Sequence, residues 1–153
     1  MKRIKPKYKQ GVFICRNPQK YVGTHPIFFR SGLEMKFMRW LDRNPNVISW
    51  SSESVIIPYV DPLSLHTKKI RRYFVDNTVV IKDATGTPMK YLIEIKPESQ
   101  TKPPISKRHT KSLINQQLTY AKNQAKWKAA TEWCAKKGDI KFMIITEKDL
   151  NNL

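Results

Sequence analysis

Arg71–Asp76 (RRYFVD) and Tyr91–Lys96 (YLIEIK) are the two segments that decide the fold of this chain. Both are short and rich in β-branched or aromatic residues, which predicts two strands. The polar segment Lys82–Pro88 (KDATGTP) lies between them and carries Gly86 at its tip, as a turn does. We therefore expect an antiparallel hairpin whose first strand ends at Asp76.

Three charged residues of these segments are candidates for one site. Side chains alternate along a strand, so Glu94 and Lys96 should point to the same face of the sheet, while Ile93 and Ile95 point to the core. Two carboxylates such as Glu94 and Asp76 can hold a hard divalent cation through oxygen. A lysine beside them can orient or help to activate a water molecule.

The composition indicates a single domain with a polyanionic partner. The chain has 153 residues, of which 40% are hydrophobic, enough for one domain with a core. Its net charge of +17 and its pI near 10.0 are extreme for this length. They favour nucleic acid as the partner, with an acidic membrane surface second. A basic protein of the ribosomal type is an alternative that charge alone does not separate.

Several classes of site and of location are excluded. Cys15 and Cys134 lie far apart in the sequence and form no disulfide framework, which fits a reducing compartment. The histidines are scattered, so we expect no structural zinc site. The basic N-terminus is not followed by an apolar run, and no stretch is apolar enough to span a membrane. We expect a soluble intracellular protein with no membrane partner.

The first twenty residues form a predicted basic arm ahead of a single domain at 21–153. The arm is interrupted by prolines and glycine and contains no acid. It is either a solvated tail or a segment that orders on phosphates. Its candidate DNA-binding residues are Lys2, Arg3, Lys5, Lys7 and Lys9.

A helix is predicted from Ser31 to about Arg43, and it contains the acidic residue Glu34. Ser31 followed by Glu34 is typical of a capping box, in which the glutamate accepts from the backbone N–H of the cap. Glu34 also borders the apolar face of the helix, where a carboxylate is costly unless a positive charge meets it. From this segment alone, the capping role is favoured.

The remaining elements follow from periodicity and breakers. Segments 47–51 and 55–59 predict a bent strand or a strand pair, with Pro58 at an edge. Segment 140–146 is almost continuously apolar, which favours an inner strand of a mixed sheet. It precedes a last helical turn from Glu147. The loop 98–111 should lie beside the site, with candidate DNA-binding residues Lys102, Lys107, Arg108 and Lys111.

A long helix is predicted from about Ser112 to Lys137, with Gly138 as its C-cap. A narrow stripe of small or apolar residues should face the sheet, with Gln117 at its flank. We expect Trp127 on the opposite side, covering a neighbouring segment such as the arm. The stripe consists of Ile114, Leu118, Ala121, Ala125 and Ala129.

The order of these elements resembles the PD-(D/E)XK nuclease superfamily, and more closely its TnsA-like endonuclease domains. The resemblance covers about residues 21–148 and rests on Ile57–Tyr59, Arg72–Asp76 and Leu92–Pro97 in order. The small size and basic arm also resemble the head-completion proteins of T-even-type tailed phages. The signature is degenerate at Val75, which stands where the superfamily has its named proline.

The resemblance implies a fold and a set of site residues. The fold is α/β (α+β), with a restriction-endonuclease-like central mixed sheet flanked by helices. Asp76, Glu94 and the Ile95 carbonyl would ligate Mg²⁺ or Mn²⁺, and Lys96 would position the attacking water. With the resemblance, an active-site role of Glu34 is favoured over a purely capping role, because the first helix of the superfamily often contributes such an acid. A Gln or Lys element of the following helix would be Gln116 or Gln117, and Gln117 is preferred.

The implied activity is metal-dependent endonucleolytic hydrolysis of DNA that leaves a 5′-phosphate. The setting would be phage head completion or DNA packaging, with the protein in the host cytoplasm or the virion and with head or portal proteins as further partners. The alternative is a non-catalytic DNA-binding head protein that keeps the nuclease fold. Retention of Asp76, Glu94 and Lys96 favours the enzyme, since a decayed nuclease usually loses one of them.

Overall fold

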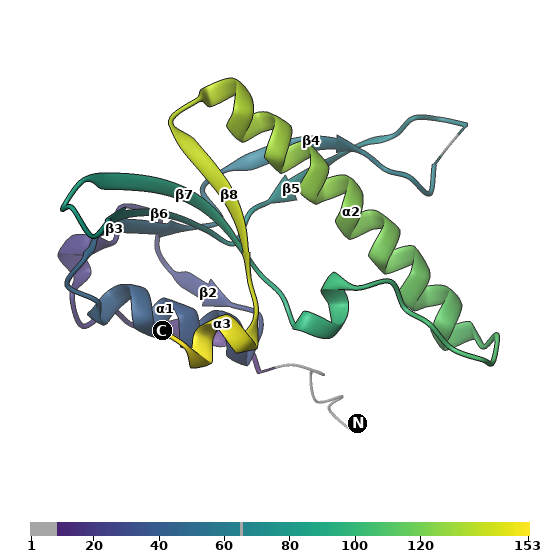
Figure 1. Ribbon diagram of the computed structural model, residues 1–153, viewed down its shortest axis with the longest axis horizontal. Coiled ribbons are helices and arrows are strands. Elements are labelled where there is room, and N and C mark those ends of the chain that lie inside the picture. Colours follow the sequence, from purple (N-terminus) through teal and green to yellow (C-terminus); the bar gives the residue numbers. More distant parts are fainter. Residues whose placement is uncertain (1–8, 65) are drawn as a thin grey trace.

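The computed structural model describes residues 9–64 and 66–153 (Figure 1). Its helices are α1 (Gly32–Arg43), α2 (Lys111–Lys137) and α3 (Glu147–Asn151), with short 3₁₀ turns η1 (Pro18–Lys20) and η2 (Glu98–Thr101). Its strands are β1 (Gly11–Phe13), β2 (Ile27–Phe29), β3 (Val47–Ser52), β4 (Ile56–Val60), β5 (Ile70–Phe74), β6 (Asn77–Lys82), β7 (Pro88–Ile95) and β8 (Ile140–Ile145).

The predicted central mixed sheet is present. Its order is β3-β6-β7-β8, antiparallel except for the parallel pair β7–β8. Strand β8 lies at the edge of this sheet, so the prediction of an inner strand was wrong. Its apolar run has another cause: Ile145 packs in the core on one side of the sheet, while Ile140 and Ile144 pack on the other.

The hairpin forms with a different first strand from the one predicted. Strand β6 pairs with β7, with Asn77 opposite Ile93, whereas β5 pairs with β4 in a separate two-stranded ribbon. The prediction overlooked the β-branched run of β6 because Asp76 looked like a strand end. The predicted turn is confirmed, and Gly86 adopts φ 81°, which side chains disfavour.

Segments β3 and β4 are not a strand pair. Strand β3 pairs with β6, and β4 belongs to the ribbon, where Pro58 is opposite Arg72. Because that ribbon has only two strands, Pro58 does lie at an edge, as predicted.

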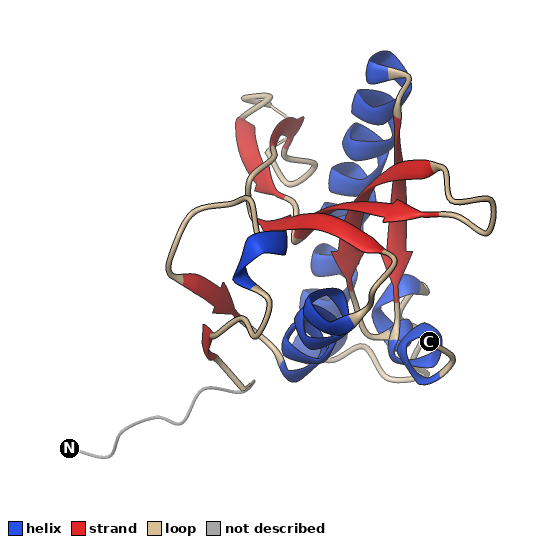
Figure 2. Cartoon of the chain, turned by 90° about the vertical axis from the view of Figure 1, so that its left-hand side faces the viewer, coloured by secondary structure: helices blue, strands red, loops and turns tan. Residues whose placement is uncertain are grey.

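Two helical layers cover the central sheet (Figures 1 and 2). On one side, Ile93 and Ile95 pack with Phe37 and Leu41 of α1. On the other, Leu92 packs with residues of α2. Alternate residues of β7 therefore meet different helices, and Glu94, which alternates with Ile93 and Ile95, lies on the same side of the sheet as Leu92.

Helix α2 has the predicted length and the Gly138 C-cap, but its buried face is rotated. Ile114 and Leu118 are exposed, whereas Trp127 is 7% exposed and belongs to the core. The covering role predicted for Trp127 was therefore wrong. The stripe misled because only the C-terminal half of α2 packs on the sheet, where Ala130 and Cys134 are buried. Among the described residues, no helix combines the length and apolar character needed to span a bilayer.

The predicted arm is shorter than twenty residues. Residues 9–20 pack on the domain, where β1 pairs with β2 and the buried Asp42 accepts hydrogen bonds from the N–H groups of Arg16 and Asn17, each at 2.9 Å. A buried carboxylate with two backbone donors is a specific anchor. The rest of the prediction, residues 1–8, lies outside the described residues.

Candidate active site

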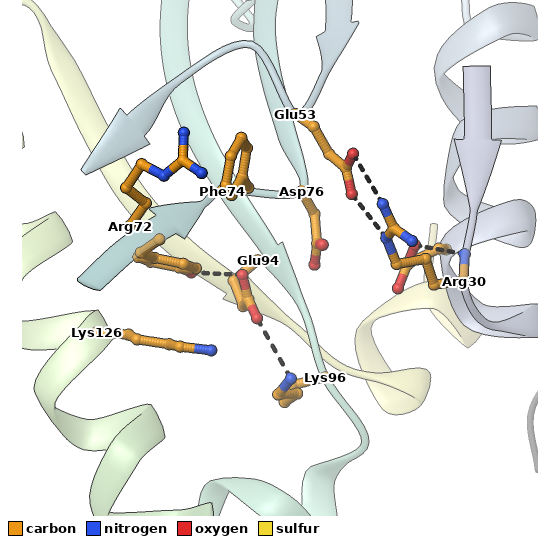
Figure 3. A pocket seen from close by; sticks show the side chains of 10 residues that line it. Arg30, Glu53, Arg72, Phe74, Asp76, Glu94, Lys96 and Lys126 are labelled. Atoms are coloured by element: carbon orange, nitrogen blue, oxygen red, sulfur yellow. Dashed lines mark hydrogen bonds and ion pairs between the residues drawn. The ribbon is translucent and has the colours of Figure 1, made fainter. Parts of the chain in front are cut away.

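One cavity of about 470 Å³ brings together the four residues with which the sequence analysis built its site (Figure 3). Asp76 comes from the link between β5 and β6, Glu94 from β7, Lys96 from just beyond it, and Glu34 from the first turn of α1. The structure thus joins groups that are 62 residues apart in the chain. Both carboxylates of the Asp76–Glu94 pair face the same cavity.

Asp76 is held in place by the backbone of β7. Its Oδ2 atom accepts a hydrogen bond of 2.7 Å from the N–H of Ile95. Burial raises the pKa of Asp76 well above its usual value, and the charges of Glu94 and Glu34 raise it further. Burial and the two neighbouring carboxylates therefore all disfavour the charged form of Asp76.

Glu94 is buried and lies between two partners. One carboxylate oxygen accepts a hydrogen bond from the hydroxyl of Tyr73, and the other lies 3.4 Å from Nζ of Lys96. Tyr73 is 3% exposed, and burial, followed by the charge of Glu94, raises its pKa strongly, so it remains a protonated donor. These contacts fix the carboxylate and leave the Lys96 ammonium at the edge of the cavity (Figure 3).

Glu34 faces the cavity and also contributes to the start of α1. Ser31 caps the helix by accepting from the N–H of Glu34 at 3.1 Å, as predicted. The Glu34 carboxylate, however, accepts from the N–H of Arg30 at 2.9 Å, one residue before the cap, so the capping box is incomplete. Burial raises the pKa of Glu34, an effect that the Arg30 hydrogen bond opposes. The helix start and the site thus share this side chain.

An ion pair between Arg30 and Glu53 closes one side of the cavity. Nε and Nη2 of Arg30 lie 2.9 and 3.3 Å from the two carboxylate oxygens of Glu53. Glu53 adopts φ 51°, a left-handed conformation that is uncommon for such a residue, and its N–H donates to the Asp76 carbonyl at 3.0 Å. Such backbone conformations cluster at functional sites. Neither residue was predicted, since both lie in loops without a motif.

Lys126 and Arg72 are further cations of the site that the sequence analysis missed. Nζ of Lys126 lies 5.5 Å from the ring centre of Tyr73, and burial, followed by the nearby Lys96, lowers its pKa. Arg72 lies over the ring of Phe74 at 5.5 Å. Arg72 belongs to the segment Arg71–Asp76, and the alternation of side chains along a strand puts it on the same face as Phe74. Lys126 could be assigned to the site only once the face of α2 that packs on the sheet was known.

Other predicted residues lie elsewhere. Gln117 is exposed and does not line the cavity, so the expectation that it faces the sheet was wrong for the same reason as the rotated stripe of α2. Residues Lys2, Arg3, Lys5 and Lys7 are outside the described residues. The remaining basic candidates are all exposed and none lines the cavity: Lys9, Lys102, Lys107, Arg108 and Lys111.

The donor chemistry fits a hard divalent cation. Among the described residues, no three acidic, imidazole or thiol side chains form a ready-made metal cluster. Mg²⁺ does not require one, because it keeps several waters and is commonly bound by one or two carboxylates. The N–H and C=O of an extended residue leave the strand on the same side, so the Ile95 carbonyl faces the side on which its N–H meets Asp76.

The comparisons with known proteins agree with this geometry. The family model described as TnsA-like endonuclease N terminal matches residues 44–147. The chain belongs to this TnsA-like endonuclease family. The matched segment contains Asp76, Glu94 and Lys96, and Glu34 precedes it. With its mixed sheet between helical layers, this TnsA-like chain has a restriction-endonuclease-like α+β fold.

A curated relative covers nearly the whole chain. The head completion nuclease of Enterobacteria phage T4 is 40% identical over an alignment of 149 residues, and the match covers 94% of each protein. The similarity therefore extends beyond the family segment of this TnsA-like chain, into the residues that precede it.

Proposed function

We propose that this chain is a metal-dependent DNA endonuclease that acts in phage head completion. The observation that carries the proposal is the convergence of Glu34, Asp76, Glu94 and Lys96 on one cavity of a TnsA-like fold. The relative named for head completion supplies the setting. The net charge of +17 supports DNA as the substrate.

Asp76, Glu94 and the Ile95 carbonyl would hold Mg²⁺ or Mn²⁺, with Glu34 as a further carboxylate. When bound, the cation polarises a water and offsets the charge that develops on the scissile phosphate. The raised pKa values of Asp76 and Glu34 support this assignment, because crowded carboxylates gain from a bound cation.

The side chains of the chain itself orient the reactants. Tyr73 holds the Glu94 carboxylate, and Lys96, 3.4 Å from the same group, would donate a hydrogen bond from Nζ to the attacking water. Arg72 and Lys126 lie on the wall of the cavity, where each would contact a phosphate oxygen. Attack at phosphorus with departure of the 3′-oxygen would leave the 5′-phosphate product.

The biological setting suggests two further partners and a location. A nuclease that finishes heads would meet DNA at the head or portal, so head or portal proteins are proposed partners. The protein would be made in the host cytoplasm and retained in the virion.

Plasmid nicking tests the activity. Purified protein should convert supercoiled plasmid to the open circle in Mg²⁺ or Mn²⁺ and should not do so in EDTA. Linear, branched and single-stranded DNA should be assayed in parallel. If wild-type protein cleaves none of them with either metal, the non-catalytic head protein becomes the better account.

A further inference from the structure

A second and larger hollow lies beside the active-site cavity. This hollow, called the groove below, has a volume of about 960 Å³ and runs between the first half of α2 and the segment from η2 to Ile105. Figure 1 shows the chain after η2 running outward beside this half of α2, which then leads back to the sheet. The sequence analysis treated the two walls as a loop and a helix flank, and nothing in the proposed chemistry uses the space between them.

The groove and the active-site cavity are lined by neighbouring residues of the same two segments. Lys96 lines the cavity, and Ser99, three residues later, lines the groove. Lys126 lines the cavity, and Asn123, nearly one helical turn earlier, lines the groove. A strand whose phosphate occupies the cavity would therefore enter the groove with its next nucleotides.

Asn123 presents a side-chain amide to the groove. It is 5% exposed, yet its amide makes no hydrogen bond within residues 9–64 and 66–153. Nearly all buried polar side chains are paired. Its polar atoms are not among the fully enclosed, unpaired atoms of the described residues, so the amide is open to a group that enters the groove.

The other walls suit a nucleobase better than a phosphate. Tyr120, half-buried, offers an aromatic face one turn before Asn123, and Pro103 and Pro104 lie across from α2. Lys102 is the one cation of the lining, and it pairs with Glu98 at 3.4 Å. Amides recognise base edges and aromatic rings stack on base faces, and both are accessible together when a base is unpaired.

We propose that this groove binds an unpaired stretch of DNA next to the scissile phosphate, so that the preferred substrate carries a single-stranded tail. The inference rests on the proposed function, whose substrate it specifies. From Lys126 to Gln116, α2 rises by about 15 Å, which spans about four nucleotides at ~3.4 Å each. The exposed cations Lys107, Arg108 and Lys111 border the far end, where the backbone of the tail would leave.

Binding titrations in Ca²⁺ separate the groove from the chemistry. The ligands are a blunt duplex and the same duplex with a tail of about four nucleotides at its 5′ or 3′ end. Wild type should bind one of the tailed duplexes about tenfold more tightly than the blunt one, because stacking contributes this much per base. Tyr120→Ala and Asn123→Ala should lose most of this preference and keep blunt-duplex affinity.

Two neighbouring glutamines give a matched control. Gln116 lines the groove and Gln117 does not, so Gln116→Ala should reduce the preference for a tail and Gln117→Ala should retain it. Tyr120→Phe keeps the ring and should also retain it, which guards against a folding defect. Equal binding of all three duplexes by wild type, or a preference that survives Tyr120→Ala, would overturn the proposal.

The failure of the groove and the failure of the nuclease differ in these assays. If wild type nicks DNA in Mg²⁺ and shows no preference for a tail, the groove proposal fails and the enzyme stands. If wild type never cleaves but Tyr120→Ala abolishes a preference for a tail, the groove stands and the catalytic proposal fails.

Discussion

Asp76 Oδ2 lies 2.7 Å from the backbone nitrogen of Ile95, so the acid that follows β5 is tied to the strand that carries Glu94. This hydrogen bond explains why two carboxylates from different segments of the chain stay on one cavity. Its donor belongs to the backbone, so the arrangement survives substitution of most side chains around it. It does not relieve the crowding of charge, because Glu94 and Glu34 both raise the pKa of Asp76.

Asp76→Asn should stabilise the metal-free protein at neutral pH. The folded-state pKa of Asp76 is raised, so the folded state binds the proton more tightly, and stability falls as the pH rises through that pKa. Asparagine keeps an acceptor for the Ile95 N–H and carries no charge. Thermal melts in EDTA should show a higher melting temperature for the variant at pH 7.5, with a gap that shrinks toward pH 4. Equal melting temperatures of wild type and variant at both pH 7.5 and pH 4 would show that the charge of Asp76 does not destabilise the folded protein.

Tyr73→Phe should destabilise the protein by about 1.5–3 kcal/mol, because a buried carboxylate loses a donor. The matched control is Tyr59→Phe, since Tyr59 is also buried and opposes Arg71 in the same ribbon, with no hydrogen bond from its hydroxyl to any described residue. Urea denaturation measures both. A Tyr59 variant as unstable as the Tyr73 variant would mean that the loss is general to the ribbon.

Asp42→Ala should release the N-terminal segment that β1 begins. Two backbone hydrogen bonds to a buried carboxylate are lost, at a cost of about 2–4 kcal/mol. Limited proteolysis should then cut within residues 9–20, while Asp139→Ala, at an exposed acid without a described hydrogen bond, should resemble wild type. Unchanged protection of the segment in Asp42→Ala would place its anchor elsewhere.

Removal of residues 2–8 should weaken DNA binding through charge alone. The segment carries Lys2, Arg3, Lys5 and Lys7. If all contact phosphates, the slope of log affinity against log salt should fall in magnitude by about 3–4. Deletion of residues 2–20 should in addition destabilise the fold, because residues 9–20 pack on it. An unchanged slope in the shorter deletion would show that these four residues do not touch DNA.

Much of this fold follows from local patterns, and its departures have specific causes. The caps at Ser31 and Gly138 predicted the start of α1 and the end of α2 correctly, because capping is a local property. The partner of β7 was predicted wrongly, because the aromatic residues of β5 and the β-branched residues of β6 both predict a strand, and only tertiary pairing shows which one pairs with β7.

The site was likewise predictable where its residues stand in local motifs, and not where tertiary packing places them. Glu34, Asp76, Glu94 and Lys96 stood in recognisable motifs and converge as expected. Lys126 could not be predicted, because its place in the cavity depends on which face of α2 packs on the sheet. Glu53 could not be predicted either, because its place depends on a left-handed backbone conformation in a loop. Gln117 was preferred over Gln116 on a helical wheel whose apolar stripe was rotated, because α2 extends beyond the sheet.

The central claim is that the carboxylates bind a cation and Lys96 acts on water, which predicts different losses for two substitutions. Asp76→Asn should abolish Mg²⁺-dependent nicking and keep or raise DNA affinity, since one repulsive charge is removed. Lys96→Ala should slow nicking by about 10²–10⁴-fold while metal binding persists. Asp83→Asn, in the exposed β6–β7 turn, is the control.

The most direct measurement is plasmid nicking in Mg²⁺ by wild type and these three variants, alongside metal titration and DNA binding in Ca²⁺. We expect nicking by wild type and Asp83→Asn, none by Asp76→Asn, and a large loss with intact metal binding in Lys96→Ala. Cleavage that survives in both Asp76→Asn and Lys96→Ala would contradict this expectation.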